Sequence, residues 1–498
     1  MGGRQSGQSG RGPTGAAARG GASRASGQAG GPSPRAARAW SLAGRGIASV
    51  CDRRAGPCPR THALSVRPCS RLAAHLSAPV QSPTPIPCHS AQNTLNDREL
   101  LRLADQCVKC GLCLPHCPTF RLQHNEADSP RGRVALIQGL ITGQLSDNAR
   151  LGTHLDGCLE CRACEVACPS LVQFGALMDA ARAARVAKLP WWRRWWRRLR
   201  LDLLSGTRLL ALLGLLAGAY RRFGLAALVH RAGLLRWPRL RVLHGLALRL
   251  RRPVPPRALR MATAAADADP DAGPPPVALF RGCVARALEP DVAQSALRVL
   301  HRLGIQVQVP DGQGCCGAMH RHNGFPERAD GLLARNRAAF GDAAVIGGAS
   351  ACVAELRPAL AASELCRAVL ERPWPAGLEL ASLHGTVAVH EPCSHRNQLR
   401  DTAAVYELLR RIPGLRVVAL PGNESCCGAA GTYLLDQPQT ALALAADKVA
   451  ALSRLAPRWL VTTNTGCAAH LAAAARDAGL ELEVLHPVVL LARSLGCE

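Results

Sequence analysis

Two short cysteine runs constrain this chain more than any other feature of its sequence. Residues 107–118, CVKCGLCLPHCP, and residues 158–169, CLECRACEVACP, both follow the pattern C-x2-C-x2-C-x3-C-P. This spacing holds [4Fe–4S] clusters, because the first three thiolates wrap one loop around three iron corners of the cube. The proline then turns the chain away. The sequence therefore predicts two iron–sulfur clusters.

The ligands of each cluster follow from the same pattern. In two-cluster ferredoxins the fourth cysteine of each run ligates the other cluster. We therefore assign one cluster to Cys107, Cys110, Cys113 and Cys168, and the other to Cys158, Cys161, Cys164 and Cys117. Structural zinc sites usually pair two C-x2-C units across a long gap, and disulfide frameworks suit short secreted chains. The 22 cysteines in 498 residues instead favour a reducing compartment, since cluster ligands must remain thiolates.

Residues 95–185 are predicted to form a ferredoxin-like domain that is mainly helical. Helical periodicity follows a capping-type Asn-Asp pair at 96–97, and between the cysteine runs Ser129 and Pro130 are suited to begin a helix. The separation of the two runs leaves room for this helix, which favours a helical ferredoxin over the compact βαβ form. Arg131 and Arg133 lie near a predicted cluster site, where their charge would tune the cluster electrostatically or serve in docking. Alternatively, they belong to a solvated helix face.

Residues 1–94 are rich in Gly, Ser, Ala and Arg and contain no acidic residue before Asp52. Such a segment cannot bury enough apolar surface to offset its chain entropy, so we expect disorder. The composition is typical of an organellar transit peptide, or of a start codon assigned too far upstream, and the second interpretation is favoured. The cysteines of this segment lack metal-site spacing and are not predicted ligands: Cys51, Cys58, Cys69 and Cys88.

Residues 186–276 are predicted to form a basic, aromatic helical linker. The formal net charge of +26 raises nucleic acid and anionic membranes as partners. Paired tryptophans, Trp191, Trp192, Trp195 and Trp196, alternate here with paired arginines. The apolar stretch 209–220 is too short to span a bilayer, which requires about 20 residues. An interfacial helix on anionic lipid or a helix packed on a partner subunit is favoured, and nucleic acid is not, because no recognition module surrounds the stretch. The Pro- and Ala-rich residues 253–276 are expected to be a flexible linker.

The remainder of the chain is an internal repeat, covering residues 277–386 and 387–498. VALFRGCVAR (277–286) aligns with VAVHEPCSHR (387–396), QGCCGA (313–318) with ESCCGA (424–429), and AAVIGGASACVAEL (343–356) with RWLVTTNTGCAAHL (458–471). Strands such as IQVQVP and RVVALP alternate with helices, which predicts parallel sheets with crossover helices. The predicted fold class is therefore a helical two-cluster ferredoxin domain followed by a tandem α/β domain.

Each copy of the repeat carries four aligned cysteines. They are Cys283, Cys315, Cys316 and Cys352 in the first copy, and Cys393, Cys426, Cys427 and Cys467 in the second. Because ligands bind at the carboxyl ends of parallel strands, each set is expected to converge on one rim. Gly317 and Gly428 are expected to let the backbone approach a bulky inorganic group. A metal or redox role is favoured over buried, inert cysteines.

At this point the chain resembles a known family. Two ferredoxin runs followed by two CCG repeats are similar to the iron–sulfur subunit of glycolate oxidase, and the motifs DSPRGR, QGCCGA, CCGAAGTYLLDQP and TTNTGC carry the resemblance over residues 95–498. Related chains include a membrane-anchor subunit of anaerobic glycerol-3-phosphate dehydrogenase and heterodisulfide reductase subunits. In the last group the repeats end in C-x2-C, where this chain has Glu355 and His470. His470 is a candidate substitute ligand, and Glu355 is a poorer one for soft iron–sulfur chemistry.

The resemblance implies an electron-transfer subunit without a catalytic residue of its own. The sequence lacks a Gly-rich dinucleotide loop and a nucleophile–base set, so the implied substrate oxidation belongs to a flavoprotein partner that carries FAD and converts glycolate to glyoxylate. Electrons would then reach an acceptor such as a quinone. The alternatives are an iron–sulfur subunit of a D-lactate or glycerol-3-phosphate dehydrogenase, and a heterodisulfide reductase-like catalytic CCG subunit. The CCG cysteines are expected to hold a further cluster or zinc. The protein is expected to be cytoplasmic, or bound peripherally to the inner membrane.

Overall fold

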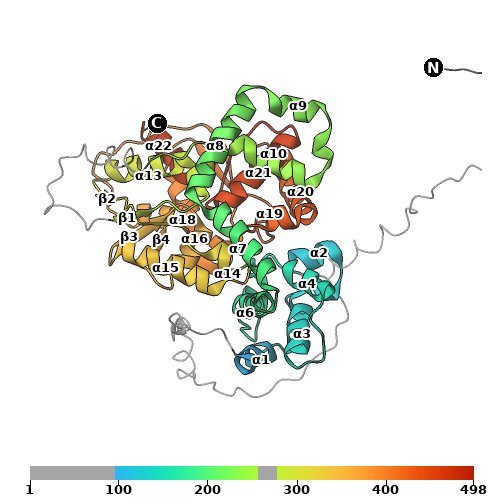
Figure 1. Ribbon diagram of the computed structural model, residues 1–498. Helices are drawn as coiled ribbons and strands as arrows, with labels where there is room; N and C mark the ends of the chain where they lie inside the picture. Colours follow the sequence, from blue (N-terminus) through green and yellow to red (C-terminus); the bar gives the residue numbers. More distant parts are fainter. Residues whose placement is uncertain (1–95, 256–258, 260–276, 498) are drawn as a thin grey trace, which may run out of the picture. The chain divides into compact units, whose positions relative to one another are not determined.

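The computed structural model describes residues 96–255, 259 and 277–497 (Figure 1). The extension 1–94, with its four cysteines, and most of the linker 253–276 lie outside the described residues. The described chain is helical and contains two small parallel sheets, each of four strands. This arrangement confirms the predicted fold class, α followed by tandem α/β.

The ferredoxin-like region is built from short helices whose starts are encoded locally. Asn96 caps the first helix by accepting from the Glu99 amide at 2.9 Å while Glu99 accepts from the Asn96 amide, and Ser129 caps the third by accepting from the Gly132 amide at 2.9 Å. Each such cap contributes about 1 kcal/mol. Leu100, Ile137, Leu177 and Met178 belong to the buried core between the helices. The elements are α1 (Asp97–Asp105), α2 (Pro118–Gln123), η2 (Glu126–Asp128), α3 (Pro130–Ile141), α4 (Ala149–Asp156), α5 (Ala163–Val166) and α6 (Phe174–Ala187).

The basic, aromatic segment is helical as well. Its elements are α7 (Trp191–Ser205), α8 (Thr207–Arg222), α9 (Leu225–Arg231), η3 (Leu234–Arg236) and α10 (Pro238–Arg249). Asp202 ties α7 to the first repeat, accepting from Arg328 at 2.9 Å and lying 3.2 Å from His320. Among the described residues no single helix is both long and apolar enough to cross a membrane. Helices α7 and α8 reach that length and hydropathy only together, and they are bent by 65°.

The first repeat alternates strands with helices as predicted. Its elements are β1 (Val277–Phe280), α12 (Ala285–Leu288), α13 (Pro290–Arg302), β2 (Val307–Gln308), α14 (Ala318–Arg321), α15 (Pro326–Phe340), β3 (Ala344–Gly347), α16 (Ser350–Leu356), β4 (Ala362–Glu364) and α17 (Leu365–Leu370). The sheet order is β2-β1-β3-β4, and all pairs are parallel. The β1–β3 register aligns Val277 with Ala344.

The second repeat has the same topology. Its elements are β5 (Gly385–Val389), the π-helical turn η4 (Ser394–Leu399), α18 (Ala403–Arg410), β6 (Leu415–Ala419), α19 (Tyr433–Asp436), α20 (Pro438–Leu455), β7 (Trp459–Val461), α21 (Thr465–Asp477), β8 (Glu483–Leu485) and α22 (Pro487–Ser494). The sheet order is β6-β5-β7-β8, again parallel.

The two repeats share one hydrophobic core. It includes Val277 and Ile346 from the first sheet, and Val387 and Val461 from the second. Helix α13 of the first repeat packs on α22 at the end of the second, and the two helices lie side by side in Figure 1. Because all strands in each sheet run parallel, the loops that follow β1, β3, β5 and β7 lie at the carboxyl ends where the predicted cysteines follow.

Candidate metal centres

The two ferredoxin cysteine runs form loops with the same backbone. In the first loop Lys109 and Gly111 have φ values of 56° and 86°, and at the matching places of the second loop Glu160 and Arg162 have 50° and 56°. Side chains other than glycine rarely adopt positive φ, and such residues cluster at functional sites. The repeated pair of left-handed residues indicates one loop geometry built twice.

The eight cysteines differ in exposure, and the difference follows the two assigned ligand sets. The buried ones are Cys117, Cys158, Cys161 and Cys164, whereas Cys107, Cys110, Cys113 and Cys168 are exposed or half-buried. The four buried cysteines line one cavity, together with Arg133 and Phe174. Sulfurs from two separate loops thus border a shared space, and this donor set fits a [4Fe–4S] cluster. The ligand assignment itself stays a prediction.

Two buried arginines act on the inner cysteines. The side chain of Arg133 is 1% exposed and donates to the Thr119 hydroxyl at 3.0 Å and the His154 carbonyl at 2.8 Å. Arg182 donates to the Cys158 carbonyl at 2.8 Å. Burial raises the pKa of the Cys158 thiol, and the charges of both arginines oppose that rise. Arg133 therefore does not belong to a solvated helix face.

Arg131 lies at the outer loop instead. Its Nη1 donates to the Lys109 carbonyl at 3.2 Å, and a Cβ added at Gly111 would lie 2.7 Å from that nitrogen. Its positive charge also interacts with the thiols of Cys110 and Cys113. Each cysteine loop consequently has arginine charge beside it, although the two arginines of the DSPRGR segment serve different loops.

The second repeat gathers its four cysteines as expected. Cys393 lies just past β5, Cys426 and Cys427 lie in the loop after β6, and Cys467 lies in the first turn of α21. The Cys427 and Cys467 sulfurs are 3.2 Å apart, and the Cys393 and Cys426 sulfurs are 3.9 Å apart. The neighbouring Cys426 thiol and burial raise the pKa of Cys393, so a nearby cation would favour its thiolate.

A histidine joins this cluster that sequence reasoning did not select. One ring nitrogen of His390 lies within 4.8 Å of the Cys427 and Cys467 sulfurs, and all three residues are buried. Burial, with the charge of Lys448, lowers the pKa of His390 to about 3. The imidazole is therefore neutral, which is the form that binds metals. The internal alignment could have revealed it, because the first repeat has Phe280 at the same place.

The first repeat also brings its cysteines together. The Cys283 and Cys315 sulfurs are 3.6 Å apart, and Cys316 interacts with Cys352. Phe280 packs with Cys316 and Cys352 in a hydrophobic cluster, so a phenyl ring stands where the second repeat has imidazole.

The residues at the two truncated C-x2-C ends have partners of their own. The His470 Nε2 lies 3.0 Å from the Ala441 carbonyl oxygen, so this ring nitrogen is engaged in a hydrogen bond. Glu355 accepts from Arg321 Nε at 2.7 Å. Neither residue belongs to a group of potential metal ligands among the described residues. The geometry therefore favours His390 over His470 as the nitrogen donor near the second set of cysteines.

The glycines of the two CCG motifs are required by the local backbone, and their approach to an inorganic group stays a prediction. Gly317 and Gly428 have φ values of 102° and 90°. A Cβ at these positions would lie 2.9 Å from the Ala329 carbonyl oxygen and 2.7 Å from the Ala441 carbonyl oxygen. The motif thus needs glycine for its left-handed turn and for its close approach to the following helix, α15 or α20.

The second repeat closes over the inner ferredoxin loop. Asn397 donates to the Cys161 carbonyl at 2.7 Å, and the Tyr433 hydroxyl donates to the Gly157 carbonyl at 3.2 Å. Cys161, Cys426 and Tyr433 share one hydrophobic cluster, against which Cys393 is packed. The charges of Cys161 and Cys393 also interact. The cysteines of the second repeat are therefore direct neighbours of the inner cluster ligands.

An ionic cluster connects the first repeat to the same loop. The His322 Nδ1 lies 2.6 Å from Glu160 and 2.9 Å from Asp179, and Arg182 pairs with Glu160. Burial favours a higher pKa for Glu160, but His322 and Arg182 outweigh it and lower the pKa to about 2. Residues this far apart in sequence give no local signal, so sequence reasoning missed the group.

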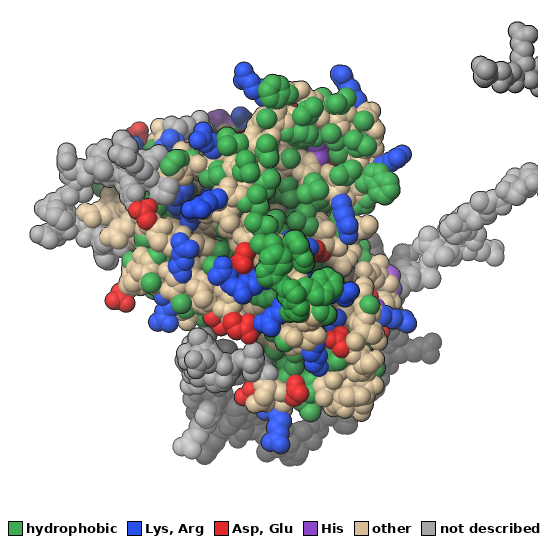
Figure 2. Space-filling model, in the orientation of Figure 1, with side chains coloured by type: hydrophobic (Ala, Val, Ile, Leu, Met, Phe, Trp, Pro, Cys, Tyr) green, Lys and Arg blue, Asp and Glu red, His purple; other side chains and the backbone are tan. Residues whose placement is uncertain are grey.

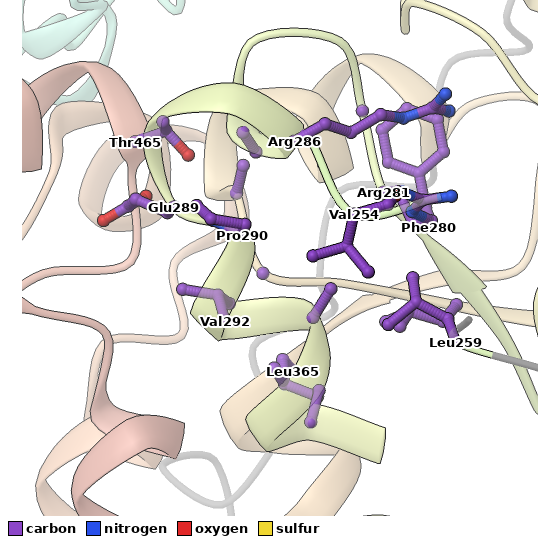
Figure 3. A pocket seen from close by; sticks show the side chains of 17 residues that line it. Val254, Leu259, Phe280, Arg281, Arg286, Glu289, Pro290, Val292, Leu365 and Thr465 are labelled. Atoms are coloured by element: carbon purple, nitrogen blue, oxygen red, sulfur yellow. Dashed lines mark hydrogen bonds between the residues drawn. The ribbon is translucent and has the colours of Figure 1, made fainter. Parts of the chain in front are cut away.

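A separate pocket lies at the carboxyl end of β1 (Figure 3). Arg281 and Arg286 line one part of it, and Val254, Leu259 and Val292 form its apolar wall. Burial lowers the pKa of Arg281 to about 10. None of the predicted cysteine ligands lines this pocket, which distinguishes it from both cysteine sites of the repeats.

Comparison with known proteins agrees with these centres. Residues 103–172 match the 4Fe-4S dicluster domain, and residues 277–357 and 387–472 match the cysteine-rich domain CCG. The chain is 29% identical over 209 residues to lactate utilization protein A of Bacillus velezensis, covering 38% of this chain and 88% of that protein. These domain matches support iron–sulfur clusters as cofactors.

Two relatives match over a longer part of the chain. It is 28% identical over 434 residues to the probable glycolate oxidase iron–sulfur subunit of Bacillus subtilis, covering 81% of this chain and 95% of that protein. It is 31% identical over 399 residues to the glycolate oxidase iron–sulfur subunit of Escherichia coli, covering 74% of this chain and 90% of that protein. With two cysteine loops, two CCG repeats and this extent of similarity, the chain belongs to the family of glycolate oxidase iron–sulfur subunits.

Proposed function

We propose that this chain relays electrons from an FAD-containing partner subunit to an acceptor such as a quinone, during oxidation of glycolate to glyoxylate. The observation that carries the proposal is the cavity lined by Cys117, Cys158, Cys161 and Cys164, directly beside the cysteines of the second repeat. Bound [4Fe–4S] clusters would supply one-electron carriers, whereas reduced flavin holds two electrons. The chain's own residues determine where those carriers sit and how readily they accept an electron.

The arginines are suited to this second task. Arg133 and Arg182 place buried positive charge beside Cys158, and Arg131 places charge beside Cys110 and Cys113. Positive charge favours the reduced, more negative form of a nearby cluster and so raises its reduction potential. The low exposure of Arg133 strengthens the effect, because solvent screens a buried charge less.

Glycolate is the substrate favoured by the longest similarities, and another 2-hydroxy acid such as D-lactate is the second candidate. The name of the relative lactate utilization protein A supports that alternative. A heterodisulfide reductase-like catalytic role has less support. The last cysteine of the C-x2-C end is replaced in the first repeat by Glu355, which is paired with Arg321.

Replacing Cys113 with Ser tests the relay. The variant should lose electron delivery to the acceptor, while substrate-dependent flavin reduction in the partner persists, because substrate oxidation does not involve this cysteine. Flavin absorbance and acceptor reduction are measured in the assembled complex, with Cys497→Ser as the matched control outside the predicted ligand sets. Loss of flavin reduction in an intact complex would refute a pure relay.

The acceptor side of the relay is proposed to lie at an anionic lipid surface. Figure 2 shows apolar side chains gathered over α7, α8 and α9 with arginines around them. The exposed residues include Trp191, Trp192, Trp195, Trp196, Leu212, Leu215, Leu216, Phe223, Leu228 and Trp237. Large exposed apolar patches indicate interaction sites, and Trp and Leu beside Arg suit the interface of an anionic membrane.

Flotation with vesicles containing phosphatidylserine, compared with neutral vesicles, tests this attachment. Binding should weaken at high salt and weaken further when Trp191, Trp192, Trp195 and Trp196 are all replaced with Ala, because screening removes charge attraction and truncation removes apolar contact. A variant with Leu122, Leu145 and Leu171 replaced by Ala is the control, since these leucines are exposed outside the patch. A chain that remains unbound on anionic vesicles at low salt would contradict the proposal, and would leave a partner subunit as the occupant.

A further inference from the structure

The second CCG repeat contains more than its four cysteines. His390 follows the last residue of β5, and its ring lies with the Cys427 and Cys467 sulfurs in one buried group. Sulfur from thiolates and nitrogen from a neutral imidazole are ligands that iron and zinc both accept. The aligned Cys393 and Cys426 lie at the edge of the same group, in hydrogen-bond contact with each other.

Thr462 holds the imidazole in position. The His390 Nδ1 lies 3.0 Å from the Thr462 hydroxyl at the end of β7. A histidine that ligates a metal through one ring nitrogen usually has the other held by a polar partner, which fixes the tautomer and the ring orientation. With Nδ1 held by Thr462, Nε2 is the nitrogen available for a metal.

The first repeat supplies an internal comparison in which both residues change together. The alignment places Phe280 at His390 and Gly347 at Thr462. A Cβ at Gly347 would lie 3.9 Å from the Phe280 Cβ, so these two residues are neighbours just as their counterparts are. A phenyl ring without a nearby hydroxyl serves packing, whereas imidazole with a hydroxyl partner is the arrangement of a positioned ligand.

A buried cation accompanies the histidine in the second repeat. Lys448 is 2% exposed, donates to the Gly422 carbonyl, and interacts electrostatically with Cys426, Cys427 and Cys467. Counting from the prolines that begin α15 and α20, the first repeat has Asn336 at this place. A buried group of thiolates requires compensating positive charge, and Lys448 offers part of it.

We propose that His390 is the nitrogen ligand of a metal–thiolate centre in the second repeat, with Cys427 and Cys467 among its sulfur ligands and the rest drawn from Cys393 and Cys426. The metal is iron in a cluster or Zn²⁺, which share this ligand chemistry. The first repeat has Phe280 at the matching place, and the histidine beside its cysteines is His320, which contacts Cys315 from α14, just after the CCG motif. The inference goes beyond the relay through the ferredoxin cysteines, and its test requires neither the flavin partner nor turnover.

The test counts metals and detects nitrogen. Wild-type full-length chain, His390→Phe, His390→Cys and the control His470→Phe are reconstituted anaerobically, in separate arms with iron plus sulfide and with zinc. Iron and zinc per chain are measured by mass spectrometry, and histidine nitrogen at the metal by X-ray absorption. His390→Phe is expected to lose the metal of one centre, about four iron atoms if it is a [4Fe–4S] cluster or about one zinc ion.

His390→Cys and the control decide whether that loss is specific. His390→Cys should retain metal but lose the nitrogen scattering, because a thiolate replaces imidazole, and retention also shows that the repeat still folds. His470→Phe should retain both metal and nitrogen. Unchanged metal and nitrogen scattering in His390→Phe would overturn the proposal, as would equal losses in His390→Phe and His470→Phe.

Discussion

The two CCG repeats share one scaffold and differ in the side chains that surround their cysteines. Both have a four-stranded parallel sheet of the same order, and both place a vicinal cysteine pair before a left-handed glycine. Around the second set stand His390, Thr462 and Lys448, whereas the first set has Phe280, Gly347 and Asn336. A duplicated fold can therefore keep its backbone while the charge and the histidine beside each set of cysteines come from different positions, which in the first repeat are Arg286 and His320.

The repeats also differ in their contact with the inner ferredoxin loop. The second repeat meets it with Asn397, Tyr433 and the apolar cluster that contains Cys426. The first repeat meets it through the ion pairs of His322 with Glu160 and Asp179. The cysteine-bearing side of the second repeat is thus adjacent to the inner loop, whereas the first repeat contacts that loop through ion pairs.

Removing the vicinal cysteines should produce the largest difference between the repeats. The Cys426→Ala, Cys427→Ala variant is expected to lose metal and to slow acceptor reduction by about tenfold or more, equivalent to about 1.4 kcal/mol. The matched Cys315→Ala, Cys316→Ala variant should slow it far less, because its cysteines are not packed against Cys161. Metal content and acceptor reduction by the complex are compared. Equal slowing would remove the functional distinction between the repeats.

Alanine at the two CCG glycines should have an equal and intermediate effect. Gly317→Ala and Gly428→Ala each force alanine into the left-handed region, which costs about 1–2 kcal/mol, and each brings a Cβ within 3.0 Å of a helix carbonyl. Urea denaturation should show similar losses in the free energy of unfolding. A loss confined to one repeat would show that their backbones are not equivalent.

The smallest effect is expected from copying His470 into the first repeat. Glu355→His removes one carboxylate partner of Arg321, which keeps its 2.8 Å ion pair with Asp330, so Arg321 stays paired and the free energy of unfolding should fall only slightly. The metal content after reconstitution should stay that of the wild type. A gain of bound metal would show that this position, and therefore His470, does face the cysteines.

The elements with local signals were predictable from the sequence. Asn96 and Ser129 begin helices as expected, and the alternating strands and helices form parallel sheets. The strand expected from IQVQVP is only Val307–Gln308, whereas the matching edge strand β6 runs over Leu415–Ala419. Local patterns thus locate elements well and give their lengths less well, since two edge strands at matching places differ in length.

The side chains that act across the fold were harder to predict. Arg133 has the sequence context of a solvated helix face, yet it is buried among the inner cysteines. His390 precedes Cys393 by three residues, but this spacing alone does not show that the ring is held in place, which depends on Thr462 just past β7. Comparing the repeats position by position provides the missing signal, because Phe280 with Gly347 and His390 with Thr462 change as pairs.

The unequal burial of the two ferredoxin loops has a consequence for survival in air. Cys110 is exposed and Cys107 and Cys113 are half-buried, whereas Cys117, Cys158, Cys161 and Cys164 are covered by protein. Thiolate oxidation follows accessibility, so dioxygen and peroxide attack the outer loop first. A chain damaged in this way would keep its inner centre intact, and repair would need to reach only the loop that already faces solvent.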